Sequence, residues 1–238
     1  MAILFGFPGA GAGRNVFEIW QKKLEPDLTF KEILYNRNLA APCCRTMEEA
    51  AERCVSEVLS ACGKEEERYF FGHCMGAAVA YETAKRLAVD HGISIQGLFI
   101  SAFTSPDVPI EDGISHLDDT AFAKEIRSHG TFPDEFFVNP AILKLFLPRI
   151  RADYRLIEEY QDQEGYVLDC PFAGFFGRED ESVTEDGMRN WSSYTSCTFR
   201  KYYFPGNHYF YYDHQEEIIE TIRELIGEYR NQKSGGVN

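Results

Sequence analysis

The chain has 238 residues, 44% of them hydrophobic and 26% charged. This balance predicts one large globular core and excludes a disordered, collagen-like or coiled-coil protein. Lys and Arg number 24 against 38 Asp and Glu, a formal net charge of −14, so nucleic acid and anionic membrane surfaces are unfavourable partners. We expect neither a membrane span nor a signal peptide, because no apolar run could cross a bilayer and the first residues run directly into glycine.

Predicted strands and helices alternate along the chain, according to hydrophobic period and residue type. In chain order they are strand 2–7, helix 15–24, strand 28–35, helix 46–62, strand 68–72, helix 76–91, strand 97–102, strand 171–177, helix 184–194, strand 198–204 and helix 216–229. Thr46 and Glu49 form a capping-box pattern at the start of one helix. The alternation predicts an α/β fold with a mostly parallel central sheet flanked by helices.

The alternation is interrupted between residues 105 and 165. This stretch has helical patterns at 118–128 and 140–160 and no convincing strand, and Pro148 should break or kink the second helix. Sixty residues are too many for a simple connection. We therefore expect one domain over residues 1–238 with a helical lid insertion at about 105–165; the alternative is an ordinary pair of crossover helices.

The seven cysteines show no C-x-x-C spacing, which disfavours a disulfide framework or a zinc site. We expect reduced thiols, a cytoplasmic location and no metal or cofactor. The cysteines are Cys43, Cys44, Cys54, Cys62, Cys74, Cys170 and Cys197.

The segment Gly72-His73-Cys74-Met75-Gly76 joins a predicted strand to a predicted helix. This is the context of a nucleophile elbow, G-x-S-x-G, with sulfur in place of the hydroxyl oxygen. The two glycines are needed because a Cβ there would collide with the neighbouring strand or helix. Cys74 would lie at a helix N-terminus, which favours its thiolate. The alternative is a buried structural cysteine at a tight turn.

A catalytic base and an acid are predicted at the ends of the last two strands. Of six histidines, His208 follows the final strand in a loop, whereas the others fall inside the elbow, on helices or in the insertion. Asp180 follows the preceding strand and is the best candidate for the acid, with Glu179 and Glu181 as solvated neighbours. The order Cys74, Asp180, His208 is the chain order of α/β-hydrolases.

An oxyanion in the transition state needs two fixed N–H donors. We expect one from Met75, directly after the nucleophile, and the other from Ala10 in the glycine-rich loop 7–13. The loop lacks the G-x-G-x-x-G spacing of a dinucleotide-binding site, so we reject a nucleotide-binding interpretation.

Over nearly its whole length the chain resembles the type II thioesterases of nonribosomal peptide and polyketide synthesis, within the α/β-hydrolase superfamily. Its F-P-G-A-G and G-H-C-M-G-A segments are similar to the family's F-P-H-A-G-G and G-H-S-M-G-A. The most specific stretch is 140–160, which resembles the family's L-P-x-L-R-A-D-[FY] segment. Residues 177–183 and 205–208 look like the G-x-x-D-x-x-V and P-G-x-H motifs.

The resemblance implies that Cys74, Asp180 and His208 are catalytic and that Ala10 and Met75 form the oxyanion hole. The implied substrate is an acyl or aminoacyl group on the phosphopantetheine arm of an acyl or peptidyl carrier protein. Because sulfur makes the acyl-enzyme itself a thioester, acyl or aminoacyl transfer to another thiol or amine is the alternative to hydrolysis. A non-catalytic binding module is a third hypothesis.

Two further groups have possible roles in substrate binding. Aromatic residues could line an acyl pocket, although ordinary core packing is the simpler explanation: they are Phe103, Phe136, Phe137 and Phe146. A basic group could dock an acidic carrier protein, or could pair with Asp153, Glu158 and Glu159. Its members are Lys144, Arg149, Arg151 and Arg155.

Overall fold

The computed structural model describes residues 2–12, 16–33, 35, 42–63, 66–129, 132–162 and 165–235. Six strands form one sheet in the order β2-β1-β3-β4-β5-β6, and every neighbouring pair is parallel. All six predicted strands are present. Their bounds are β1 Ala2–Phe7, β2 Thr29–Glu32, β3 Glu67–His73, β4 Gly97–Ser101, β5 Phe172–Gly177 and β6 Phe199–Phe204.

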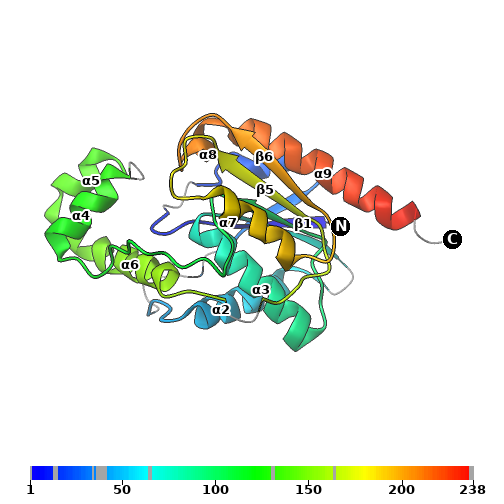
Figure 1. Cartoon of the computed structure of the whole chain (residues 1–238), viewed down its shortest axis with the longest axis horizontal. Helices are drawn as coiled ribbons and strands as arrows, with labels where there is room; N and C mark the ends of the chain where they lie inside the picture. Colours follow the sequence, from blue (N-terminus) through cyan, green and yellow to red (C-terminus); the bar gives the residue numbers. More distant parts are fainter. Residues whose placement is uncertain are drawn as a thin grey trace.

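Helices cover both faces of the sheet (Figure 1). On one face lie α2 (Met47–Ala61) and α3 (Met75–His91), and on the other α1 (Trp20–Leu24) and α9 (Gln215–Gly235). The predicted α/β architecture is confirmed. No helix in the described part of the chain has the length and apolar character of a membrane span.

Strand β1 shows why its sequence is an unbroken apolar run rather than an alternating one. Ile3, Phe5 and Phe7 pack into the core on the side of α2 and α3. Ala2 and Leu4 pack into the core on the side of α1 and α9. Because side chains alternate between the two faces of a strand, a sheet covered on both sides needs apolar residues at every position.

The segment between β4 and β5 is helical, and we call it the insertion; its function as a lid stays a prediction. It contains α4 (Asp119–Ser128), α5 (Asp134–Val138) and α6 (Pro140–Glu158). In Figure 1 these helices lie to one side of the sheet. They enclose a small core of their own around Phe122, Ile126, Leu147 and Ile150. Between Ser101 and Phe172 the described residues contribute no strand.

Pro148 does not break helix α6, so the predicted break is wrong. The helix continues through Pro148 to Glu158. A proline removes the hydrogen bond to the carbonyl four residues earlier, here that of Lys144. Both residues lie on the exposed side of the helix, where water can bind the freed carbonyl.

The observed bounds of several other helices differ from the predicted ones. Within the predicted helix 15–24, residues 16–19 form turns and α1 begins at Trp20, while Asn15 lies outside the described residues. The predicted helix 184–194 divides into α7 (Glu185–Asn190) and a 3₁₀ helix, η1 (Trp191–Tyr194). Two short helices, α5 and α8 (Phe210–Asp213), were not expected. Their five and four residues are too few to show a helical period.

Candidate active site

The sheet has a natural site at the carboxyl ends of β1 and β3. The chain passes from β1 to β2 on one side and then returns to β3 on the other. In open parallel sheets such a reversal separates the connecting loops and leaves a crevice for ligands. Cys74 follows β3 directly, and the loop Pro8–Ala12 follows β1. The predicted nucleophile and the predicted oxyanion loop therefore lie at the same edge of the sheet.

Cys74 has the strained backbone expected of a nucleophile elbow, with φ 54° and ψ −129°. A Cβ added at Gly72 would lie 2.3 Å from the Gly76 carbonyl oxygen. A Cβ at Gly76 would lie 2.0 Å from the carbonyl oxygen of Phe7 in β1. No side chain fits at such separations, so the predicted steric need for both glycines is confirmed.

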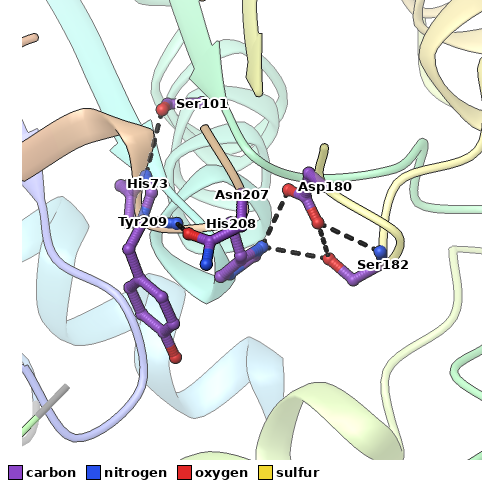
Figure 2. A network of polar contacts seen from close by, with 7 residues as sticks. All are labelled: His73, Ser101, Asp180, Ser182, Asn207, His208 and Tyr209. Carbon is purple, nitrogen blue, oxygen red and sulfur yellow. Dashed lines mark hydrogen bonds and ion pairs between the residues drawn. The ribbon is translucent and has the colours of Figure 1, made fainter. Parts of the chain in front are cut away.

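Asp180 and His208 meet at the ends of β5 and β6 (Figure 2). His208 Nδ1 lies 2.9 Å from Asp180 Oδ2, and the Asp180 side chain is 2% exposed. The two loops are also joined through Glu179, whose carboxylate accepts the Gly206 N–H. Glu179 is thus more than the solvated neighbour that the sequence suggested, since it holds the acid loop against the base loop.

His208 is also coupled to Cys74, because the His208 charge lowers the pKa of the Cys74 thiol and the Cys74 charge raises the pKa of His208. Because Nδ1 faces Asp180, Nε2 is the ring nitrogen available to the sulfur. The structure therefore brings together all three residues predicted to be catalytic, from the ends of β3, β5 and β6.

The charges of this cluster favour a thiolate and an imidazolium. Burial alone would raise the pKa of Cys74, but the His208 charge and hydrogen bonds from His208 and the Met75 N–H lower it below the ordinary value. Burial would lower the pKa of His208, but the Cys74 thiolate and the Asp180 carboxylate raise it. Asp180 keeps a lowered pKa despite its burial, because His208 and Ser182 donate hydrogen bonds to it. Each group thus stabilises the charged form of its neighbour.

The two predicted oxyanion donors belong to residues near Cys74. Met75 follows Cys74 directly at the start of α3, and its N–H contributes to the lowered pKa of the thiol. Ala10 is half-buried in the loop after β1, where a Cβ added at its neighbour Gly9 would lie 3.3 Å from Cys74 Cβ. The final residue of the predicted loop, Gly13, lies outside the described residues. The function of these two amides as oxyanion donors stays a prediction.

Comparison with known proteins identifies the family. The family model described as thioesterase domain matches residues 2–226. The chain belongs to this family. It is therefore a thioesterase-family enzyme.

Three relatives illustrate the likeness. Thioesterase PikA5 of Streptomyces venezuelae is 30% identical over 222 residues, which are 92% of this chain and 79% of that protein. The crystal structure of ClbQ, from the colibactin NRPS/PKS pathway, has a TM-score of 0.88 and 27% identity, covering 96% of this chain and 98% of ClbQ. A serine-to-alanine mutant of YbtT, a type II thioesterase of the yersiniabactin NRPS/PKS pathway, has a TM-score of 0.84 and 26% identity, covering 93% and 91%. These likenesses confirm the predicted α/β-hydrolase fold.

Ser182 is a polar neighbour of the site that the sequence analysis missed. Its hydroxyl donates to Asp180 Oδ1 at 2.6 Å and lies 3.0 Å from His208 Nδ1, and its N–H also donates to Asp180 Oδ1 at 3.0 Å. Figure 2 shows this triangle. The signal available in the sequence was Asp180 itself, because an Asp side chain often accepts the backbone N–H two residues later in an Asx turn.

The histidine within the elbow, His73, contacts Ser101 and His208. It is buried, its Nδ1 lies 3.0 Å from Ser101 Oγ, and its ring centroid is 5.6 Å from that of His208. Burial, with a smaller effect from the His208 charge, lowers the pKa of His73 to about 3. His73 is therefore a neutral ring that supports His208.

The helical insertion of the thioesterase also contributes groups near the site. His129 Nδ1 lies 2.9 Å from Tyr154 Oη. Burial, followed by the His208 charge, lowers the pKa of His129. Of the four suggested pocket phenylalanines, Phe136, Phe137 and Phe146 pack in the insertion's own core, whereas Phe103 lies in the main core beside α3. The structure therefore does not bring the four together.

The predicted basic group is partly engaged within the insertion. Arg151 donates to the carbonyls of Ser115 and Leu117 and pairs with Asp119 at 2.7 Å. Asp153 and Glu158 were suggested as partners of the basic group. Asp153 accepts the Gly11 N–H, and Glu158 accepts the N–H groups of residues 114 and 115. Arg151 is thus a structural residue rather than part of a docking surface.

Cysteine and acidic side chains do not gather into a metal centre. All seven cysteines are free thiols. Within the described ranges, no three His, Cys, Asp or Glu side chains are placed to bind one metal ion.

Proposed function

We propose that this protein is a type II thioesterase that acts on acyl or aminoacyl thioesters of carrier proteins in nonribosomal peptide or polyketide synthesis. The observation that carries the proposal is the His208–Asp180 hydrogen bond at the same carboxyl edge of the sheet as the strained elbow at Cys74. The pathways named for ClbQ and YbtT support the substrate class, because carrier proteins in such pathways hold their acyl groups as thioesters.

In the first half-reaction the Cys74 thiolate attacks the thioester carbonyl carbon and forms a C–S bond. The negative charge moves to the carbonyl oxygen, where the N–H groups of Met75 and Ala10 stabilise it. When the tetrahedral intermediate collapses, the bond to the pantetheine sulfur breaks. The leaving thiolate takes the proton held by the His208 imidazolium, which leaves acyl-Cys74 and a neutral imidazole.

In the second half-reaction water attacks acyl-Cys74. His208 takes the proton of the water as the new C–O bond forms, and Asp180 stabilises the resulting imidazolium. Collapse of the second intermediate breaks the C–S bond, releases the free acid and restores the thiolate–imidazolium pair. No cofactor enters either step.

The sulfur of Cys74 favours transfer as a second candidate function. With a serine nucleophile, the acyl group would pass from a thioester to a more stable oxygen ester. With Cys74 the donor and the acyl-enzyme are both thioesters, so the first step is nearly thermoneutral and reversible. A second thiol or an amine could then compete with water for the acyl group.

One experiment separates these reactions. An acyl carrier protein is incubated with the enzyme, with and without a second carrier bearing a free pantetheine thiol, and the products are analysed by mass. Free acid supports hydrolysis, and acyl groups on the second carrier support transfer. Cys74→Ala should abolish both. If the variant behaves like the original protein, the catalytic proposal fails and a binding role is left.

A further inference from the structure

In the loop after β1, the direction of the Ala10 N–H cannot be fixed by large side chains of the loop, because the loop has none at residues 9–12. Residues 9–12 are Gly, Ala, Gly and Ala. A backbone amide stabilises an oxyanion only if its direction is fixed before the reaction. The groups that fix this loop must therefore come from elsewhere in the chain.

Two contacts orient the carbonyls at the start of the loop. Tyr35 Oη donates to the Pro8 carbonyl at 2.6 Å. The Ala12 N–H donates to the Gly9 carbonyl at 3.2 Å. In a trans peptide the C=O and the following N–H point in opposite directions. Holding the Gly9 carbonyl toward Ala12 therefore turns the Ala10 N–H to the other side of that peptide.

The next peptide is held by the helical insertion. Asp153 Oδ2 on α6 accepts the Gly11 N–H at 3.0 Å, across 142 residues of sequence. Gly11 has φ +64°, and a Cβ there would lie 2.9 Å from Phe132 Cζ and 3.2 Å from Ile150 Cγ2. The insertion therefore packs directly on Gly11, and Asp153 is its hydrogen-bonding contact with the loop.

We propose that Asp153 is a positioning residue that fixes the Ala10 N–H for oxyanion stabilisation. The peptide before Gly9–Ala10 is then fixed by the hydrogen bond from Tyr35, and the peptide after it by the hydrogen bond to Asp153. A hydrogen bond to a carboxylate is stronger than one between neutral groups, so Asp153 restrains the end of the loop that faces the insertion. This inference rests on the proposed function, because it gives the insertion a part in the acyl-transfer step.

The test compares two reactions of the same sulfur. Acylation of Cys74 by an acyl-pantetheine thioester passes through an oxyanion, whereas alkylation by iodoacetamide does not. We expect Asp153→Ala to slow acylation about 30-fold, part of the loss caused by removing an oxyanion donor, and to leave alkylation within about twofold. Asp153→Asn keeps an acceptor oxygen and should acylate within about threefold of the original protein.

Glu158→Ala is the matched control. Glu158 is on the same helix and also accepts backbone N–H groups, at 2.7 Å from Ile114 and 3.1 Å from Ser115, but these belong to the insertion. Its acylation rate should stay within about twofold of the original.

Three results would overturn the inference: Asp153→Ala acylating at the original rate, acylation and alkylation falling together, or Glu158→Ala losing as much as Asp153→Ala. In each of these cases the proposed function survives if the unaltered enzyme is acylated. If the unaltered enzyme is not acylated at all, the proposed function fails and this role fails with it.

Discussion

The sheet body and the helical insertion are built in different ways. In the body, every residue of β1, β4 and β5 is buried, and the predicted catalytic residues stand at the ends of these and neighbouring strands. The insertion has a small core and exposes large apolar side chains such as Val138 and Leu145, at 70% and 56%. The body can therefore hold a fixed triad, whereas the insertion depends on the body for its position.

The two regions meet through apolar packing of Leu156 and Ile157 of α6 in the core beside α3, and also through polar contacts. Besides Asp153 on Gly11, Tyr160 Oη donates to Glu82 Oε1 at 2.9 Å, and Lys85 pairs with Asp162 at 3.2 Å. Glu82 and Lys85 lie on α3, the helix that begins beside the nucleophile. We therefore expect substitutions in the body to change the reactivity of the nucleophile. Substitutions at the junction should change the position of the oxyanion loop or only the free energy of unfolding.

The largest expected effect comes from removing the sulfur. Cys74→Ala should lower thioesterase activity by about 10⁴-fold or more, because no other side chain in the cluster can form the acyl-enzyme. Hydrolysis of an acyl carrier protein measures the effect, and unchanged circular dichroism serves as the folding control. Activity within tenfold of the original would show that the body does not supply the nucleophile.

Removing the imidazole should have the next largest effect. In the original protein, alkylation of Cys74 should rise with pH through a midpoint below the ordinary thiol pKa, since His208 lowers the pKa of Cys74. In His208→Ala that pKa rises, so the midpoint moves to higher pH and alkylation at pH 7 falls about tenfold or more. Measuring the rate with iodoacetamide from pH 5 to 10 tests this. Coincident midpoints would exclude a thiolate–imidazolium pair.

Ser182→Ala should have a smaller effect. The hydroxyl lowers the pKa of Asp180, so its loss raises that pKa and moves the acid limb of the kcat profile to higher pH. One lost hydrogen bond corresponds to about a fivefold decrease in kcat, and Ser182→Thr should restore most of it. A decrease in kcat with no displacement of the pH profile would argue for a packing effect only.

The smallest effect on activity is expected where the insertion meets α3, away from the oxyanion loop. Lys85 is the cation between Asp162 and Glu82, at 3.2 and 3.5 Å. Lys85→Met should lower the free energy of unfolding by about 2 kcal/mol, because it removes the cation from beside two buried carboxylates, and should change kcat less than about twofold. Urea denaturation measures the stability, with exposed Lys124→Met as control. Equal losses in the two variants would contradict a special role for the junction.

The sequence predicted the features that depend on local pattern. Hydrophobic period located all six strands, and the two glycines around Cys74 identified the elbow because the G-x-x-x-G spacing between a strand and a helix is visible within five residues. Ser182 and Asp153 were not found, since their contacts depend on how distant segments meet. Asp153 reaches Gly11 only because α6 folds back across the loop after β1. The continuity of α6 through Pro148 likewise depends on which side of the helix faces water.

The most direct test of the account is to trap the acyl-enzyme. The thioesterase is mixed with an acyl carrier protein, quenched in acid within milliseconds to seconds, and digested for peptide mass analysis. We predict that the acyl mass appears on the peptide containing Cys74, is removed by hydroxylamine and is absent from Cys74→Ala. Release of free acid while that peptide stays unmodified at every time, with Cys74→Ala equally active, would contradict the account.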